Sequence, residues 1–146
     1  MPARKKKEAD LLVGGIKPYQ ARKGEKYMND KQFRHFRSIL LAWKAELENE
    51  IDRTISQLRQ APTTEADPND RASLETDISL ELRSRDREGK LIKKIFEALA
   101  HLDEGEYGYC NSCGVEIGIQ RLEARPTAEL CIDCKTLDEI REKQMG

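Results

Sequence analysis

Two stretches, Cys110-Asn-Ser-Cys113 and Cys131-Ile-Asp-Cys134, decide how the C-terminal part of this chain folds. Each Cys-x-x-Cys turn can point two sulfur atoms at one centre, and the 17 residues between the pairs allow the chain to fold back. Four thiolates at this spacing predict one closed, tetrahedral zinc site. Closed coordination leaves no position for water or substrate, so we expect the metal to be structural.

The same cysteines could instead form two disulfides or redox-active pairs. The chain shows no secretory segment, because Leu11-Leu12-Val13 is too short for a signal-peptide core. It also has no run approaching the roughly 20 apolar residues of a membrane span. We therefore expect a cytoplasmic protein, and a cytoplasm that keeps thiols reduced favours zinc.

The composition favours an extended helical body over a compact globule. Of the 146 residues, 36% are charged and only 5% are aromatic, and the mean hydropathy is −0.76. Elongated helices with narrow apolar seams need less apolar material than a globule of this length. The charges are grouped: residues 1–28 carry eight basic and three acidic side chains, and residues 83–94 carry six basic and two acidic ones.

A first long helix is predicted from residue 29. Asn29 suits the N-cap, Gln32 follows three residues on, and Met28 with Phe33 can form a hydrophobic staple. Pro62 ends the pattern. Apolar residues recur between them at steps of three and four: Phe33, Phe36, Leu40, Trp43, Leu47, Ile51, Ile55 and Leu58.

A second long helix has an equally clear start. Asp67 can cap it, Pro68 suits the first turn, and Asp70 places negative charge at the positive end of the helix dipole. Gly89 interrupts it at a cost of roughly 1 kcal/mol relative to alanine. Its apolar stripe comprises Leu74, Ile78, Leu82, Ile92, Ile95, Leu99 and Leu102.

Two such stripes joined by a short break predict a mainly α fold, a long antiparallel coiled-coil hairpin over residues 29–104 with its tip near 61–72. Each arm of about 30 residues would extend roughly 45 Å. We expect residues 1–28 to be a flexible segment. Residues 105–146 should form the four-cysteine module with a C-terminal helix from about Ile132, whose apolar face could rest on the hairpin base.

The predicted tip is acidic. Residues 65–82 carry six acidic side chains and one basic one, and Asp67 and Asp70 stand at the turn itself. Such acids could be no more than helix caps. Caps need one or two carboxylates, however, and an acidic end far from the body can enter a positively charged channel or approach a metal ion.

These stretches together resemble the DksA/TraR zinc-finger family of bacterial transcription factors that bind RNA polymerase. The resemblance runs from about residue 18 to the end of the chain. It is carried by Asp67-Pro68-Asn69-Asp70-Arg71-Ala72, Leu80-Glu81-Leu82-Arg83-Ser84-Arg85-Asp86-Arg87, and Tyr109-Cys110 through Cys134-Lys135.

The resemblance implies a non-catalytic regulator. In the family, the coiled coil passes through the secondary channel of the polymerase towards its active site, where tip residues that match Asp67, Asp70 and Ala72 act. There it works with the alarmone ppGpp in the stringent response, lowering ribosomal RNA transcription and raising some amino-acid biosynthetic promoters. We expect a monomer that binds no specific DNA sequence directly.

The resemblance also implies a ppGpp site at the polymerase interface, formed by Arg87, Leu91, Lys94, Arg125 and Lys135. The first three follow an i, i+4, i+7 pattern and share one face of the second helix. Converging guanidinium and ammonium groups suit a polyphosphate. From the residues alone, a solvated basic face explains the same pattern.

Other function classes have less support. A DNA-binding zinc finger needs a basic surface, yet residues 110–134 carry two arginines against four acids. A catalytic role lacks a nucleophile and base, because His35 and His101 stand isolated. A transcript-cleavage factor of the Gre type uses a similar acidic tip and is the main alternative. A chaperone would need apolar groups at the hairpin end.

Overall fold

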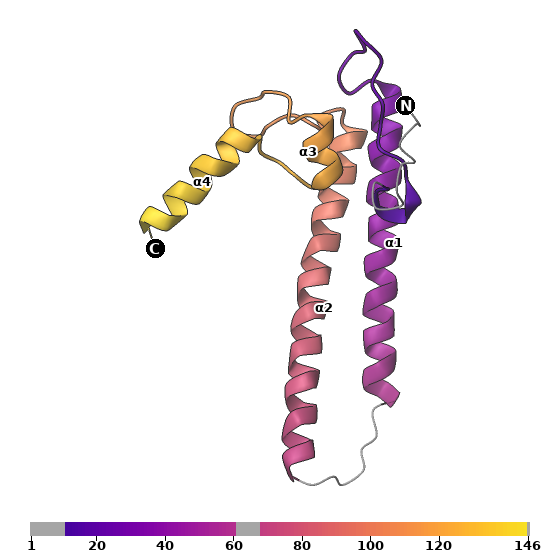
Figure 1. Cartoon of the computed structure of the whole chain (residues 1–146), viewed down its shortest axis with the longest axis vertical. Helices are drawn as coiled ribbons and strands as arrows, with labels where there is room; N and C mark the ends of the chain where they lie inside the picture. The colour runs from indigo at the N-terminus through magenta and orange to yellow at the C-terminus, as the bar shows by residue number, and fades with distance from the viewer. Residues whose placement is uncertain (1–10, 61–67, 146) are drawn as a thin grey trace, which may run out of the picture.

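The computed structural model describes residues 11–60 and 68–145 (Figure 1). Within these ranges the chain is mainly helical and contains no strand, only an isolated antiparallel bridge between Tyr109 and Glu116. None of the described helices combines the length and apolarity needed to cross a membrane. The elements are a 3₁₀ turn η2 (Val13–Gly15), α1 (Asp30–Gln60), α2 (Pro68–Asp103), α3 (Ile119–Ala124) and α4 (Ile132–Met145).

Helices α1 and α2 form the predicted antiparallel hairpin (Figure 1). The N-terminal cap of α1 forms as expected, because the Gln32 amide donates to Asn29 Oδ1 at 2.9 Å. In return, Gln32 Oε1 accepts a hydrogen bond from the Met28 amide at 2.6 Å. These two bonds fix where the first arm begins.

The apolar core lies at the base of the hairpin, where the first turns of α1 pack against the last turns of α2. Phe36, Ile39, Leu40 and Ile95 are fully buried there. Ile39 is not on the predicted stripe, and it shows that the buried face of α1 is wider near the base than a coiled-coil seam. Leu122 of α3, also fully buried, extends this core into the cysteine module.

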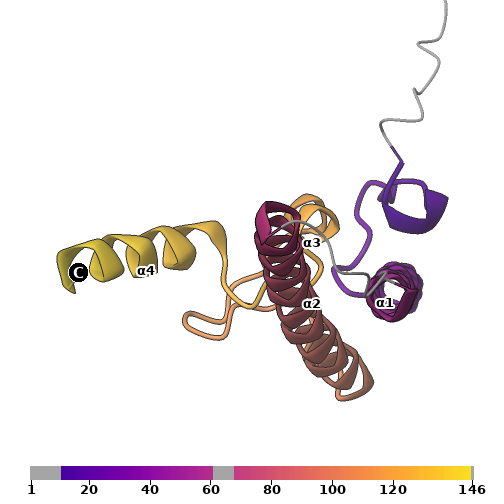
Figure 2. The same ribbon diagram turned by 90° about the horizontal axis from the view of Figure 1, so that it is seen from below.

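The far half of the hairpin is open rather than closely packed. Leu74 and Leu82, which we expected to lie in the seam, are 39% and 42% exposed. A hollow of about 590 Å³ separates the arms at mid-length. Figure 2 shows α1 end-on and α2 obliquely, so the two axes are not parallel. The hollow is lined by Glu50, Arg53, Thr54, Gln57, Asp77, Leu80, Glu81, Ser84 and Glu88.

Residues 11–28 pack against the hairpin base, so the prediction of a flexible segment is wrong for this part of the chain. The Tyr27 hydroxyl donates to Gly108 O at 2.7 Å and accepts from the Gly118 amide at 2.9 Å. Gly14 has φ +70°, and a Cβ there would lie 2.8 Å from Ala42 Cβ. These contacts join positions far apart in the sequence, which periodicity cannot reveal.

Helix α4 points away from the hairpin, so the expectation that it rests on the hairpin base is also wrong (Figures 1 and 2). Its apolar residues Ile132, Leu137 and Ile140 are 65%, 52% and 46% exposed. The base is already covered by the buried Leu122 and by residues 11–28. The start of α4 is instead fixed to the cysteine cluster, where the Lys135 amide donates to Cys131 O at 3.0 Å.

Candidate metal centre and cationic pocket

The four predicted cysteine ligands meet at one point. The Sγ atoms of Cys110, Cys113, Cys131 and Cys134 all lie within 4.8 Å of one another, and those of Cys113 and Cys131 are 3.7 Å apart. Sulfur atoms placed tetrahedrally at 2.3 Å from a zinc ion are separated by about 3.8 Å. All four cysteines are free, so the structure contradicts the disulfide alternative.

Backbone hydrogen bonds in the cysteine turns position the sulfur atoms. The Gly114 amide donates to Cys110 O at 2.9 Å, and the Cys110 amide donates to Val115 O at 2.8 Å. Gly114 has φ +78°, a conformation that glycine adopts without strain. The Asn111 amide donates to Glu129 O at 2.8 Å and thereby links the first cysteine turn to the segment before the second.

Two thiols of the cluster have pKa values shifted in opposite directions. Backbone amides, first that of Cys131, lower the pKa of the Cys110 thiol to about 6. Hydrogen bonds with the neighbouring thiols, first that of Cys131, raise the pKa of Cys134 to about 12. Zinc binds thiolates rather than thiols, so the four cysteines would be deprotonated when they hold the metal. One zinc ion held by four thiolates fits this donor set.

A buried polar network attaches the module to the hairpin base. The Tyr107 hydroxyl donates to Pro126 O at 2.6 Å, and Glu123 Oε2 lies 2.7 Å from His35 Nε2. The same Glu123 oxygen accepts from the Tyr19 amide at 2.8 Å. Sequence reasoning missed this network and treated His35 as isolated, because its partner lies 88 residues away.

A cationic pocket lies between α2 and the module and has a volume of about 180 Å³. The lining of the pocket contains four basic side chains and one carboxylate, so the pocket has a positive potential. Arg121 Nε donates to Leu130 O at 3.1 Å and so fixes one wall. The lining residues are Lys94, Arg121, Arg125, Thr127, Ala128, Glu129, Leu130 and Lys135.

The structure therefore brings together three of the five residues expected at the nucleotide site, Lys94, Arg125 and Lys135. Arg87 and Leu91 lie on α2 outside the lining of this pocket: Arg87 is exposed and Leu91 packs partly against the core. Arg121 was missed, because α3, which carries it into the lining, was not predicted from the sequence.

The described part of the predicted tip, residues 68–72 at the start of α2, lies at the opposite end of the hairpin from the module (Figure 1). Asp67 falls outside the described residues. Asp70 belongs to the first turn of α2, and Ala72 is exposed two residues further on. Lys94, in the lining of the cationic pocket, lies 24 residues along α2 from Asp70, which is about 36 Å at 1.5 Å per residue.

A helical hairpin with a four-cysteine centre at its base defines a class of zinc-finger proteins. Residues 32–102 match the model of the N-terminal domain of DnaK suppressor protein DksA, and residues 105–139 match the prokaryotic dksA/traR C4-type zinc finger. The chain belongs to the DksA/TraR family, and its four clustered cysteines all lie within the stretch that matches the C4-type zinc finger.

Two relatives span almost the whole chain. The RNA polymerase-binding transcription factor DksA of Escherichia coli K12 is 58% identical over 93% of this chain and 90% of its own length. The protein of the same name from Haemophilus influenzae is 57% identical over 93% of this chain and 94% of its own. Transcription factor DksA2 from Pseudomonas aeruginosa superposes with a TM-score of 0.75 at 41% identity, covering 85% of this chain and 94% of the other.

Proposed function

We propose that this protein is a non-catalytic transcription regulator that binds bacterial RNA polymerase in the cytoplasm. The observation that carries the proposal is 58% identity, over nearly the full chain, to a factor named for binding RNA polymerase. The hairpin supports it, since an arm 31 residues long extends about 46 Å from the module. A rod of that length can place its end deep inside a large partner.

The acidic tip is the proposed acting end, inserted through the secondary channel towards the polymerase active centre. Asp67, Asp70 and Ala72 are its proposed residues, and the zinc module remains outside as the docking part. The hollow between the arms is polar, and its lining includes Glu50, Asp77, Glu81 and Glu88. Such a surface suits a water-filled, positively charged channel better than a protein core.

The proposed effector site is the cationic pocket at the other end. Lys94, Arg125 and Lys135 would contact the phosphates of ppGpp, while Arg87 and Leu91 extend the contact along α2. A pocket of about 180 Å³ is smaller than a whole drug-sized site. The polymerase would therefore supply the remaining wall, and ppGpp would bind at the interface. The bound effector would lower ribosomal RNA transcription and raise amino-acid biosynthetic promoters.

The tip is tested by replacing Asp70 with Asn and measuring polymerase binding and run-off transcription separately. We expect near-normal binding with loss of repression at a ribosomal RNA promoter. Asp138→Asn, on exposed α4, is the matched control and should behave as the parent chain. Equal losses of binding and repression would contradict the proposal. Asp70-dependent RNA cleavage in backtracked complexes would favour the Gre-type alternative.

The effector site is tested with the double variant Lys94→Ala and Arg125→Ala in the same transcription assay. It should keep its basal effect on the promoter and lose the additional response to ppGpp. The control pair Arg141→Ala and Lys143→Ala removes two exposed basic groups from α4. An unaltered ppGpp response in the first pair would exclude this pocket as the site.

A further inference from the structure

A second group of metal-ligating atoms lies at the C-terminal end of α2, outside the cysteine cluster. His101 Nδ1 lies 4.0 Å from Glu104 Oε2 and 3.9 Å from Glu106 Oε2. One ligand atom from each of the three residues falls within 4.8 Å of the other two. All three side chains are accessible to solvent, so small rotations can bring their donor atoms onto one ion.

Backbone hydrogen bonds fix the Cα positions of these three residues at the end of α2. Glu106 N–H donates to His101 O at 2.9 Å, and Gly105 N–H donates to Leu102 O at 3.1 Å. With Gly105 at φ +75°, this is a Schellman motif that closes the helix. Leu102 and Tyr107, the neighbours of the two outer ligand residues, are 5% and 4% exposed and anchor the turn in the core.

The side chains at the ends of this motif are unusual for it. The two residues that its outer hydrogen bond joins often make an apolar contact. Here they are an imidazole and a carboxylate, His101 and Glu106, with Glu104 between them. The motif therefore holds together donors of two types where it usually holds a hydrophobic pair.

The electrostatics of this end favour a cation. The C-terminus of α2 carries the negative end of the helix dipole. The nearby Arg37 is engaged by Asp103, with 2.6 Å between Nη2 and Oδ1. Across residues 11–60 and 68–145, no lysine or arginine forms an ion pair with Glu104 or Glu106. In the described part of the chain, the imidazole of His101 is therefore the one basic group within ion-pair distance of these two carboxylates.

We propose that His101, Glu104 and Glu106 bind one first-row divalent transition-metal ion. Imidazole nitrogen favours such ions over magnesium and calcium, which prefer all-oxygen sites, and carboxylates disfavour soft copper(I). Three ligands leave further positions to water, so this site is exchangeable, in contrast to the closed cysteine site. A bound ion would tie the end of α2 to the segment that enters the cysteine module. The proposal does not depend on polymerase or ppGpp.

The test is calorimetric titration of Ni²⁺ into the untagged, zinc-loaded chain, followed by desalting and elemental analysis of the zinc and nickel that the chain retains. We expect one Ni²⁺ bound per chain with the zinc retained. His101→Ala, and separately the pair Glu104→Gln and Glu106→Gln, should each weaken Ni²⁺ binding at least tenfold. Mn²⁺ should bind more weakly than Ni²⁺ to the parent chain.

The matched control is the pair Glu139→Gln and Glu142→Gln, which removes two exposed carboxylates from α4. It should bind Ni²⁺ as the parent chain does, which separates ligation from the change in net charge. Absence of a bound Ni²⁺ equivalent would overturn the proposal. So would Ni²⁺ binding that displaces zinc stoichiometrically, or that is unchanged in His101→Ala.

Discussion

Tyr107 offers a sharp test of how the zinc module is held on the hairpin. Its hydroxyl donates to Pro126 O at 2.6 Å, while its ring packs against Phe36 with 5.5 Å between centroids. Tyr107→Phe keeps the ring and removes only the hydroxyl. Because Pro126 is buried, its carbonyl would lose its partner without gaining water. The expected loss in the free energy of unfolding is about 1–3 kcal/mol.

The assay is urea unfolding of the zinc-loaded chain, followed by far-ultraviolet circular dichroism. The midpoint should fall while the slope with urea stays constant, and Tm should drop by about 2–4 °C for each kcal/mol lost. Tyr109→Phe is the control, because Tyr109 is 39% exposed, and it should change stability by less than about 0.5 kcal/mol. A Tyr107→Phe protein as stable as the parent would refute the reasoning.

Three further changes test other parts of the account. Cys113→Ser should abolish stoichiometric zinc in metal analysis and unfold the module, since structural zinc sites contribute roughly 10–16 kcal/mol of apparent binding free energy. An unchanged zinc content would contradict the four-cysteine site. Gly108→Ala should destabilise the chain by about 1–3 kcal/mol in urea unfolding, because φ at Gly108 is +96° and the new Cβ would lie 2.9 Å from Met28 Cγ. Gly24→Ala is the control and should cost less, since Gly24 has φ +79° but open space around it. Burial between the arms is the main cause that raises the pKa of the Glu88 carboxyl above its ordinary 4.5, and the neighbouring Glu50 is the second. The folded chain therefore binds this proton more tightly than the unfolded chain does. The free energy of unfolding should consequently fall as pH rises above 4.5. Glu88→Gln should remove that fall in thermal melts, and an unchanged pH profile would count against the carboxyl pair.

The ends of the helices and the metal ligands could be predicted from the sequence because their signals are local. Asn29 and Gln32 form the cap that their spacing indicates, and the two Cys-x-x-Cys turns converge as their chemistry requires. Each depends on residues a few positions apart. The hairpin followed from two apolar stripes of similar length.

The errors arose where packing depends on distant residues. Leu82 continues an apolar stripe, yet it is exposed because the arms diverge around a polar hollow. Residues 11–28 lack periodicity and still pack, since Tyr27 bonds to Gly108 and Gly118 of the module. Side-chain pairs of this kind leave no pattern in the sequence.

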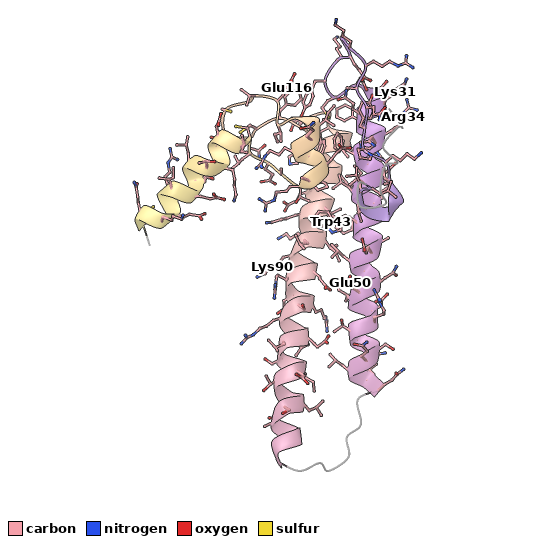
Figure 3. All side chains as sticks on the ribbon, viewed as in Figure 1. Lys31, Arg34, Trp43, Glu50, Lys90 and Glu116 are labelled. Atoms are coloured by element: carbon pink, nitrogen blue, oxygen red, sulfur yellow. The ribbon has the colours of Figure 1, made fainter. Side chains whose placement is uncertain are left out.

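The cationic pocket shows a similar limit. Lys94 lies on α2, while Arg125 and Lys135 lie in the module. Figure 3 draws the described side chains of α2 and of the module. The residues alone suggested only a solvated basic face. It was the family resemblance that grouped these three positions, and the sequence had given no reason to add Arg121.

The proposed function requires that the hairpin places its tip at the catalytic centre of RNA polymerase. The most direct measurement places a photoreactive amino acid at position 70 and maps its cross-links in the complex with core polymerase. We expect cross-links to residues around the polymerase active centre, and a probe at Leu137 on α4 should give none there. Cross-links from position 70 confined to the outer surface of the enzyme would contradict it.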